Sequence, residues 1–510
     1  MNRLISVLMM GAALLTTASA AEAQKSKDTL RFAVREVYKS MDPYLFPDDE
    51  AGFTRRRVFD PLIQFDDSKG TFVPLLAKSW TRTDDVTLEF ELFDDVTFHS
   101  GNKLTADDII YSLNFAADPN VKFPFKNRYT WFEKIEKLSP TKLRVKANRF
   151  YNQDLLHFAF RSLILDSKLH SSYSDPVDYG IKTPSGTGPY KVTNFDRNTG
   201  VTLERFEGRQ KLPYVRAPIK TVRAIFIPDQ QTQIAQLIAG NIDLAPNVQS
   251  DNAKALDAMP GFTSTAVDIG YYVYIGFDVV GRSNQKELTD PRVRKALMMA
   301  IDRDAIAKGV VPGNGLAKRQ DGMCGDWMVA CAWSTKPPAY DPAGAKKLLA
   351  EAGYPNGFDL HIDTHAAMTQ VGEAIAGYLR AVGVRATSTQ MITPVWLKKR
   401  STGDMPAVVM YLPTSLWPDS DYLLDTLFGS EGVDFVRDPI IQENVKAGNA
   451  TRDLDKRRAV YKVAFDRMME LYSYLPISTV PVLYSHSNDV RIEPNPVTQR
   501  SLYMSDIFWN

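Results

Sequence analysis

The side chains in this sequence that could do chemistry are few and scattered. Of its six histidines, His361 and His365 lie close together. On a helix that spacing would place both rings on one face, as metal ligands. Residues 358–363 instead read as a strand, along which four residues span about 13 Å. We therefore expect no shared metal site at these histidines, and His99 is better explained as a structural turn residue.

Acidic residues and nucleophile motifs give no stronger signal. Asp419-Ser-Asp421 could suggest calcium, but the glycine turn and distal glutamate of an EF-hand are missing. A solvated loop or a ligand-facing carboxylate fits this stretch better. The sequence has no Gly-x-Ser-x-Gly elbow, no His-Glu-x-x-His and no glycine-rich phosphate loop. We expect no catalytic residues, no metal and no cofactor, and hence not an enzyme.

Cys324 and Cys331 are the two cysteines of the chain, and a glycine-containing loop lies between them. Two close cysteines in an exported protein form a disulfide, because the compartment is oxidising. A metal site would need two more ligands nearby, and none is present. The sequence predicts a Cys324–Cys331 disulfide.

The N-terminal residues indicate export. Arg3 precedes an apolar core at residues 4–17, and two Ala-x-Ala sites end at Ala20 and Ala23. This is the layout of a secretory signal peptide, and its apolar core is shorter than the ~20 residues that span a bilayer. We assign residues 1–23 to the signal. No cysteine lies near the cleavage site, so we expect an unanchored, soluble periplasmic protein.

Length and charge narrow the class of protein further. A mature chain of about 490 residues is too long for one compact core, so two lobes are expected. The 61 basic and 60 acidic residues leave a net charge of +1, which provides no field for binding nucleic acid. We expect a monomer that binds no nucleic acid.

Short β-like runs alternate with amphipathic stretches along the chain. Residues 29–34, 86–92 and 222–227 read as strands, while Asp290-Pro291 and Asp341-Pro342 carry the cap and first-turn proline that begin a helix. This alternation predicts an α/β fold. Proline and glycine are scattered rather than concentrated, so we expect the lobes to be joined by crossing strands instead of a flexible linker.

Residues 98–113 (FHSGNKLTADDIIYSL) closely resemble the signature of the family 5 extracellular solute-binding proteins, the dipeptide, oligopeptide and nickel group. Seven further stretches resemble the same family in the same order, so the resemblance covers nearly the whole mature chain. They are Ser40–Pro43, Phe59–Leu62, Leu75–Trp80, Gly186–Lys191, Gln236–Asp243, Asp290–Leu297 with Ala300–Arg303, and Tyr340–Leu349 through Pro355.

The resemblance implies a two-lobed periplasmic binding protein fold. Lobe I would comprise residues 24–268 with a subdomain inserted at about 53–185, lobe II residues 269–483, and residues 484–510 would return to lobe I. The ligand would be enclosed between the lobes. The implied partners are a small-molecule or peptide ligand and an ABC permease and ATPase complex at the inner membrane.

Family members place their ligand loops after the first mature strand, near the crossing strands and on loops of lobe II. Mapped onto this sequence, those regions hold aromatic and polar residues suited to a solute site. Each of these residues could instead pack in the hydrophobic core. Core packing is slightly favoured over ligand contact for Tyr272 and Tyr274, which lie on one strand face, and the two roles are equally favoured for Trp396 and Trp417. The residues are Tyr38, Tyr272, Tyr274, His365, Trp396, Trp417 and Asp419.

The stretch 410–428 bears on the ligand, because peptide-binding members carry an aspartate here that pairs with the peptide ammonium. An alignment without gaps places Leu416 at that aspartate, and leucine leaves a buried ammonium unpaired at a cost of several kcal/mol. A shift of three residues places Asp419 there instead. We expect a non-peptide polar solute, such as an opine or a sugar conjugate. A di- or oligopeptide, and a receptor role for a membrane sensor, stay open as alternatives.

Overall fold

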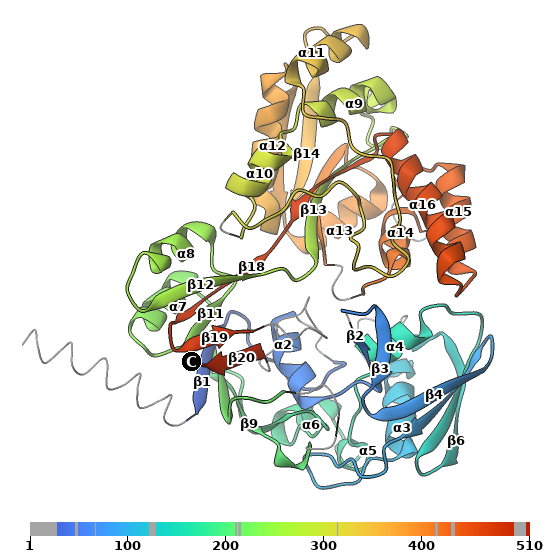
Figure 1. Ribbon diagram of the computed structural model, residues 1–510, viewed down its shortest axis with the longest axis vertical. Coiled ribbons are helices and arrows are strands. Elements are labelled where there is room, and N and C mark those ends of the chain that lie inside the picture. The colour runs from blue at the N-terminus through green and yellow to red at the C-terminus, as the bar shows by residue number, and fades with distance from the viewer. Residues whose placement is uncertain are drawn as a thin grey trace, which may run out of the picture. The chain divides into compact units, whose positions relative to one another are not determined.

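The computed structural model describes most of the chain. It covers residues 28–45, 49–66, 68–121, 129–209, 212, 216–313, 315–413, 417–429, 434–493 and 506–510. The predicted signal peptide at residues 1–23 lies outside them. The chain forms two compact units, with unit 1 comprising Met1–Val267 and Leu483–Asn510, and unit 2 comprising Asp268–Val482. Both units combine helices with sheets, which confirms the predicted α/β class (Figure 1).

Unit 1 is built on a seven-stranded sheet in the order β12-β18-β11-β1-β10-β9-β8. β1 and β10 are parallel over Thr29↔Thr221 to Val34↔Phe226, while β9 and β8 continue the sheet antiparallel. Its strands are β1 (Thr29–Val34), β8 (Tyr190–Asp196), β9 (Gly200–Arg205), β10 (Thr221–Phe226), β11 (Leu244–Pro246), β12 (Phe262–Val267) and β18 (Val482–Ser487).

A second, four-stranded antiparallel sheet of unit 1 has the order β4-β5-β7-β6. Figure 1 shows the helix α3 beside this sheet, and α3 contacts its strand β6. These strands are β4 (Ala77–Asp84), β5 (Thr87–Leu92), β6 (Phe132–Ser139) and β7 (Lys142–Ala147). The pairs β2 (Ile63–Asp66) with β3 (Thr71–Pro74), and β19 (Val490–Ile492) with β20 (Ile507–Trp509), complete the described sheets of the unit.

Helices of unit 1 connect these strands. They are α2 (Asp49–Val58), α3 (Ala106–Ala117), α4 (Asp154–Phe160), α5 (Ser167–His170), α6 (Pro176–Lys182), η2 (Glu207–Arg209), α7 (Gln230–Ile238) and α8 (Ser250–Asp257). Asp229 caps α7 by accepting a hydrogen bond from the Thr232 amide at 2.7 Å, as expected for an aspartate at that position.

The residues of the family signature at 98–113 hold loops of unit 1 together. Asp108, in the first turn of α3, accepts hydrogen bonds from the Thr105 amide at 2.8 Å and the Ser167 amide at 3.0 Å. The His99 Nε2–H donates to the Gly188 carbonyl at 2.8 Å, which confirms it as a structural turn residue. A Cβ atom on Gly186 would collide with the Val58 carbonyl oxygen, so this close approach of backbones requires glycine.

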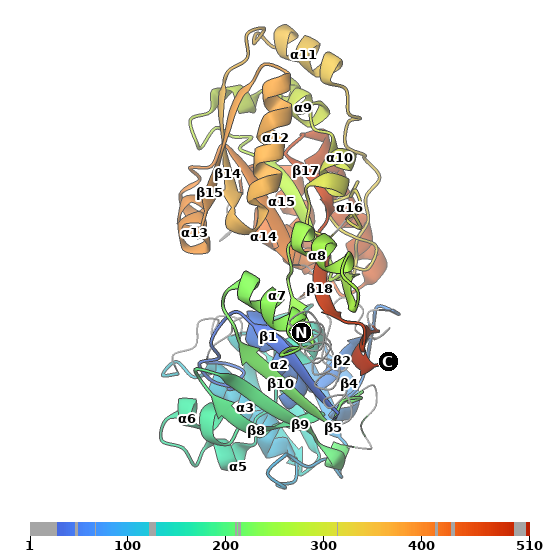
Figure 2. The ribbon, with the colours of Figure 1, turned by 90° about the vertical axis from the view of Figure 1, so that its left-hand side faces the viewer.

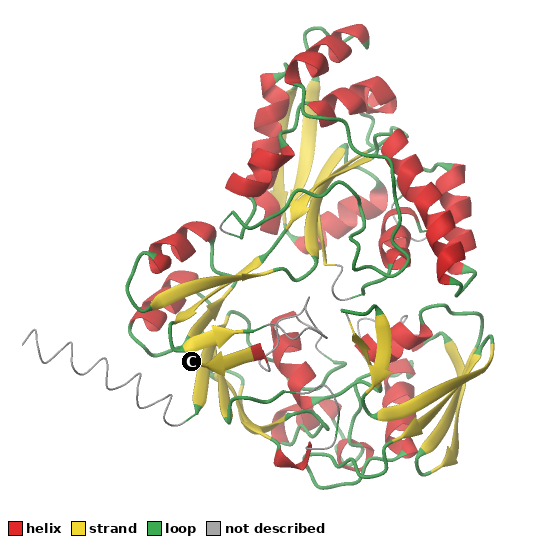
Figure 3. Ribbon diagram, viewed as in Figure 1, coloured by secondary structure: helices red, strands yellow, loops and turns green. Residues whose placement is uncertain are grey.

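Unit 2 contains a five-stranded sheet in the order β15-β14-β16-β13-β17. β14 is parallel to β15 and β16, whereas β13 is antiparallel to β16 and β17. Figure 3 shows helices around this sheet, and Figure 2 shows α12 along β14 and β15, which it contacts. The strands are β13 (Tyr271–Phe277), β14 (Asp359–His365), β15 (Arg385–Met391), β16 (Ala407–Pro413) and β17 (Tyr474–Thr479).

Two helices of unit 2 begin where the sequence predicts. Asp290 and Asp341 cap α9 and α11, each followed by proline in the first turn, which confirms both predicted starts. The helices are η3 (Lys286–Thr289), α9 (Pro291–Met299), α10 (Arg303–Gly309), α11 (Pro342–Glu351), η4 (Ala366–Met368), α12 (Thr369–Ala381), α13 (Thr393–Thr402), α14 (Ser420–Phe428), α15 (Pro439–Asn449) and α16 (Leu454–Glu470).

Two hydrophobic clusters lie on the two faces of this sheet, because successive residues of a strand point to opposite faces. Val273 and Ile275 of β13 belong to one cluster, and Tyr272 and Tyr274 to the other. Within the described residues, every helix is too short or too polar to cross a membrane.

Buried arginines explain part of the motif Asp290–Arg303. The Arg294 guanidinium donates to the Leu471 carbonyl at 2.7 Å, and it also bonds the Leu288 carbonyl, so it joins α9 to the end of α16. Burial lowers the pKa of Arg294 to about 10. Arg303 bonds the Gln320 carbonyl at 2.6 Å. Both side chains therefore serve the architecture of unit 2.

Candidate ligand-binding residues

Three connections of unit 2 leave the same edge of its sheet. β14, β15 and β16 run parallel, so their carboxyl ends meet there, with His365 opposite Met391 in the register. Ligands of α/β proteins bind outside the carboxyl ends of parallel strands. The predicted residues His365, Trp396 and Trp417 all belong to the end of β14 or to the chain that follows β15 and β16. Leu416 lies outside the described residues.

His365 ends β14 and begins the short helix η4. Its Nδ1 accepts a hydrogen bond from the Ala367 amide at 3.2 Å, and its ring meets Tyr411 edge to face at 5.3 Å between centroids. Burial lowers the pKa of His365 below its ordinary value. With Nδ1 accepting, the proton of the neutral imidazole sits on Nε2, which makes that nitrogen a donor.

Tyr272 and Tyr274 are buried in a hydrophobic cluster of unit 2, at 1% and 4% exposure. The Tyr272 hydroxyl donates to the Met323 carbonyl, and the Tyr274 ring meets Tyr474 edge to face at 5.7 Å. Burial raises the pKa of Tyr274 to about 12. Both residues pack into the core of unit 2, and their contact with a ligand stays a prediction.

Trp396 is also buried, and Arg400 lies 5.2 Å from its ring centroid in a cation–π contact. The two side chains line a cavity of about 10 Å³ together with Tyr274 and Tyr474. This volume is far below the several hundred Å³ of a solute pocket. The role of Trp396 in binding remains a prediction.

Trp417 and Asp419 lie in the segment that leads into α14, and both are 1% exposed. Asp419 caps α14 by accepting from the Asp421 amide at 3.1 Å and forms a buried ion pair with Arg457 of α16. Arg457 also lies 3.4 Å from Asp421. Burial alone would lower the pKa of Arg457, but the two carboxylates raise it above its ordinary value. The carboxylate of Asp419 is thus already ion-paired within unit 2.

Two aromatic residues at this edge were not predicted from the sequence. Tyr271 of β13 and Tyr411 of β16 stack at 5.6 Å with 23° between their planes, and Tyr411 also meets His365. The two strands are neighbours in the sheet, but their residues are 140 positions apart in sequence. Tyr271 is adjacent to the predicted Tyr272. Its position at the start of an aromatic-rich strand could have identified it as a candidate from the sequence.

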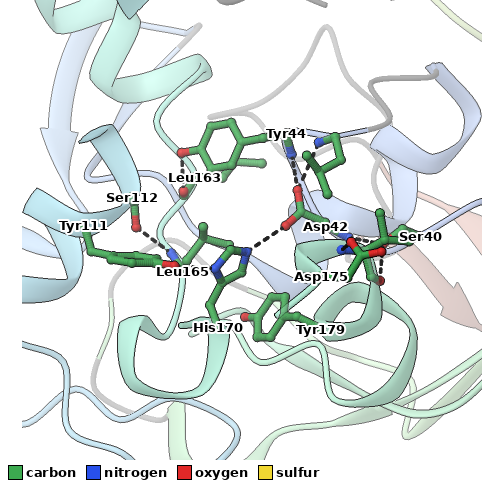
Figure 4. Close-up of polar contacts among 12 residues, drawn as sticks. Ser40, Asp42, Tyr44, Tyr111, Ser112, Leu163, Leu165, His170, Asp175 and Tyr179 are labelled. Carbon is green, nitrogen blue, oxygen red and sulfur yellow. Dashed lines mark hydrogen bonds and ion pairs between the residues drawn. The ribbon is translucent and has the colours of Figure 1, made fainter. Parts of the chain in front are cut away.

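In unit 1, the predicted Tyr38 follows β1. Its hydroxyl lies 2.9 Å from the Thr54 hydroxyl of α2, and the residue is 3% exposed. The segment just after it, Ser40–Tyr44, is fixed by a buried polar network, drawn in Figure 4.

The network resembles a catalytic triad in composition. Asp42 lies 3.2 Å from His170 Nε2, and the Tyr111 hydroxyl lies 2.6 Å from His170 Nδ1 (Figure 4). In the tautomer whose Nε2–H donates to Asp42, the Tyr111 hydroxyl donates to Nδ1. Burial, with the nearby Asp42 charge, raises the pKa of Tyr111 to about 12, so its hydroxyl keeps its proton at neutral pH. A protonated tyrosine is a poor nucleophile. The hydrogen bond between Tyr111 and His170 therefore has a structural role.

His361 and His365 lie on β14, as expected for a strand. His361 Nε2 lies 3.2 Å from Asp363, whose carboxylate also pairs with Lys399 at 2.9 Å. In the described part of the chain, no group of three or more histidine, cysteine or acidic side chains is arranged to hold a metal ion. The predicted disulfide between Cys324 and Cys331 is present and therefore confirmed.

Comparison with known proteins identifies relatives along the chain. Residues 71–435 match the family described as "Bacterial extracellular solute-binding proteins, family 5 Middle". A relative from Pectobacterium atrosepticum, named glutathione-binding protein GsiB, is 25% identical over 492 residues, covering 91% of this chain and 90% of its own. The matching family is one of solute-binding proteins rather than enzymes.

Solved structures share the fold. NikA from Brucella suis, in complex with Fe(III)-EDTA, has a TM-score of 0.81 at 20% identity and covers 94% of this chain and 100% of its own. AgaA from A. tumefaciens R10, in complex with agropinic acid, has a TM-score of 0.71 at 22% identity, covering 94% and 99%. The fold is that of the family 5 periplasmic binding proteins, as the sequence motifs predicted.

Proposed function

The chain belongs to family 5 of the bacterial extracellular solute-binding proteins, and we propose that it is the periplasmic substrate-binding component of an ABC importer. It captures a small polar solute between two lobes that close like a hinge, and the membrane permease accepts the loaded form. A solved relative of the same fold is described as an ABC transporter-associated periplasmic binding protein. This likeness supports the importer role over a receptor for a membrane sensor.

We infer that the solute is not an ordinary peptide. The observation that carries this inference is the buried ion pair of Asp419 with Arg457, which Asp421 joins from 3.4 Å. Asp419 is 1% exposed, and its carboxylate already contacts the Arg457 guanidinium and the Asp421 amide. A peptide ammonium could pair with it only by displacing these partners, and displacing the guanidinium would cost several kcal/mol. Asp419 is therefore a poor anchor for a peptide ammonium, even in the alignment that places it there.

A tripeptide is the second candidate, because the relatives named glutathione-binding protein share 25% identity over nine-tenths of both chains. The γ-glutamyl linkage of glutathione presents its ammonium differently from an ordinary peptide. Such a solute would then require an anion from another part of the site, with His365 Nε2 and the aromatic residues of the sheet edge contacting the rest.

Native mass spectrometry of the freshly purified protein tests the proposal directly, by the mass of any solute that copurifies. A thermal-shift panel then compares agropinic acid, Met-Leu and S-methylglutathione. The methylated tripeptide is used because a free thiol would attack the Cys324–Cys331 disulfide. A ligand at 100 times its dissociation constant adds about 2.7 kcal/mol. We expect the largest shift from a non-peptide solute, and Met-Leu giving it would overturn that preference.

Export is tested separately, since it depends on residues 1–23. We propose cleavage after Ala20 or Ala23 and a free, monomeric protein in the periplasm. The intact mass of the protein released by osmotic shock distinguishes the two cleavage sites. Recovery of the uncleaved chain in the membrane fraction would contradict the proposal.

A further inference from the structure

A long irregular connection of unit 2 joins α10 to α11. In its described residues, 310–313 and 315–341, it contains no helix and no strand beyond two isolated bridges (Figure 3). Connections of this length without regular structure are uncommon in compact domains, and those that occur are often functional. Its conformation must be fixed by specific interactions with the rest of the unit.

The flanks of this connection, which lie outside the ring that the disulfide closes, are attached by hydrogen bonds. On one side, the Thr479 amide of β17 donates to the Lys318 carbonyl at 2.8 Å, and the Gln320 amide donates to the Ile477 carbonyl at 3.1 Å. On the other side, the Ser334 amide donates to Asp466 of α16 at 2.7 Å. These bonds attach both flanks to the body of unit 2.

Inside the ring, residues 324–331, the backbone of Val329 pairs with a different segment. Its amide donates to the Pro418 carbonyl at 2.8 Å, and its carbonyl accepts from the Ser420 amide at 3.0 Å. Both polar groups of one residue thus pair with the stretch 417–421, as a single parallel bridge. Cys324, at 1% exposure, shares a hydrophobic cluster with Tyr272 and Trp396.

The flanks and the ring therefore hold different parts of unit 2. We propose that the Cys324–Cys331 disulfide positions the segment 417–421, and with it Trp417 and the first turn of α14. Opening the disulfide leaves both flanks attached but allows the ring to widen, which removes Val329 from Pro418 and Ser420. That this segment contacts the solute rests on the proposed function, whereas the positioning itself does not.

The redox state of this one disulfide thus controls the order of a proposed ligand segment. Reduction breaks the S–S bond and leaves two thiols. Two external thiols supply the two electrons and two protons and become a disulfide, or a phosphine supplies the two electrons and becomes its oxide while water supplies the protons and the oxygen. Because Cys331 is partly exposed, such a reductant can approach the ring from that side. The two hydrogen bonds of the Val329 backbone are then the first to break.

Hydrogen–deuterium exchange tests this positioning without any ligand. Peptic peptides containing Ser420 are compared with peptides containing Thr479, whose amide bonds Lys318 outside the ring. In the variant Cys324→Ser/Cys331→Ser, we expect the Ser420 peptides to exchange at least about tenfold faster, with the Thr479 peptides unchanged. Wild-type protein reduced with a phosphine gives the same result should the double variant fail to fold.

Ser334→Ala is the matched control, because its hydroxyl bonds Asp466 at 2.9 Å on the flank and not in the ring. It should leave exchange at Ser420 unchanged. Unaltered Ser420 exchange on loss of the disulfide, or equal acceleration at Ser420 and Thr479, would overturn the proposal. A failure of the proposed importer function would be seen in different experiments. The wild-type protein would then copurify with no solute in native mass spectrometry, and no compound of the thermal-shift panel would stabilise it.

Discussion

Each unit contains a buried polar network centred on aspartate. The two networks compensate the negative charge of the carboxylates in different ways. In unit 1, Asp42 accepts from the Tyr44 amide at 2.8 Å and the Leu45 amide at 3.0 Å, with His170 as a further partner. In unit 2, Asp419 and Asp421 share the single guanidinium of Arg457. The carboxylate of Asp42 is shared among several donors, whereas the charges of Asp419 and Asp421 are compensated by the same guanidinium.

This difference in how the carboxylates are compensated determines how firmly the neighbouring segments Ser40–Tyr44 and 417–421 are held. Ser40–Tyr44 follows Tyr38 and is fixed by several hydrogen bonds of modest strength, whose loss is partial. The segment 417–421 contains Trp417 and is held by the backbone of Val329 and by the buried ion pair of Asp419 with Arg457. Breaking that pair leaves buried carboxylates without the cation that compensates their charge. We therefore expect the unit 2 network to be the more fragile under single substitutions.

Removing the shared cation should have the largest effect. Arg457→Met leaves Asp419 and Asp421 buried without their counter-charge, so we expect a loss of about 3–5 kcal/mol in the free energy of unfolding of unit 2. Urea denaturation followed by tryptophan fluorescence measures it. The neighbouring Arg458→Met removes an exposed pair with Asp455 and should cost less than about 1 kcal/mol. Equal losses in the two variants would refute the comparison.

Removing the histidine of the unit 1 network should cost less. His170→Ala deletes one partner of Asp42, while the two backbone amides remain, so we expect about 1–3 kcal/mol. Ser171→Ala, at an exposed neighbouring position, is the control. A loss for His170→Ala larger than that for Arg457→Met would show that unit 1 has the more fragile network.

Tyr111→Phe sharpens the same comparison. The substitution removes only the hydroxyl that donates to His170 Nδ1 at 2.6 Å, on a half-buried residue. A single hydrogen bond of this kind contributes about 1 kcal/mol, and we expect a loss of that size in urea denaturation. A loss above about 3 kcal/mol, as large as that expected for Arg457→Met, would contradict a unit 1 network that is shared among several donors.

The sequence predicted the features that depend on local spacing. Asp290-Pro291 and Asp341-Pro342 mark helix starts through the cap and the fixed φ of proline, and two lone cysteines in one loop suffice for a disulfide. The motifs of the whole chain predicted the family and its fold, because their order reflects a shared architecture.

The networks could not be predicted in this way. Arg457 lies between Lys456 and Arg458 in one helix, and the sequence does not say which of the three basic side chains turns inward. Its partner Asp419 is 38 positions away, and His170 is 128 positions from Asp42. Pairing over such separations follows from tertiary packing. For the same reason, the stacked Tyr271 and Tyr411 were missed.

The smallest expected effect compares one buried histidine in each unit. Burial lowers the pKa of His365 in unit 2 and of His486 in unit 1, so each unfolded chain binds a proton more readily than the folded one. Their stabilising contribution is complete above the unfolded pKa of about 6.5 and is lost as the pH falls through the lower folded pKa.

His365→Asn keeps an acceptor for the Ala367 amide but cannot titrate. Between pH 7.5 and 5.5, we expect the melting temperature of this variant to fall less than that of the wild type. His486→Asn should behave likewise, and identical pH profiles for wild type and both variants would show that neither ring is neutralised by its burial.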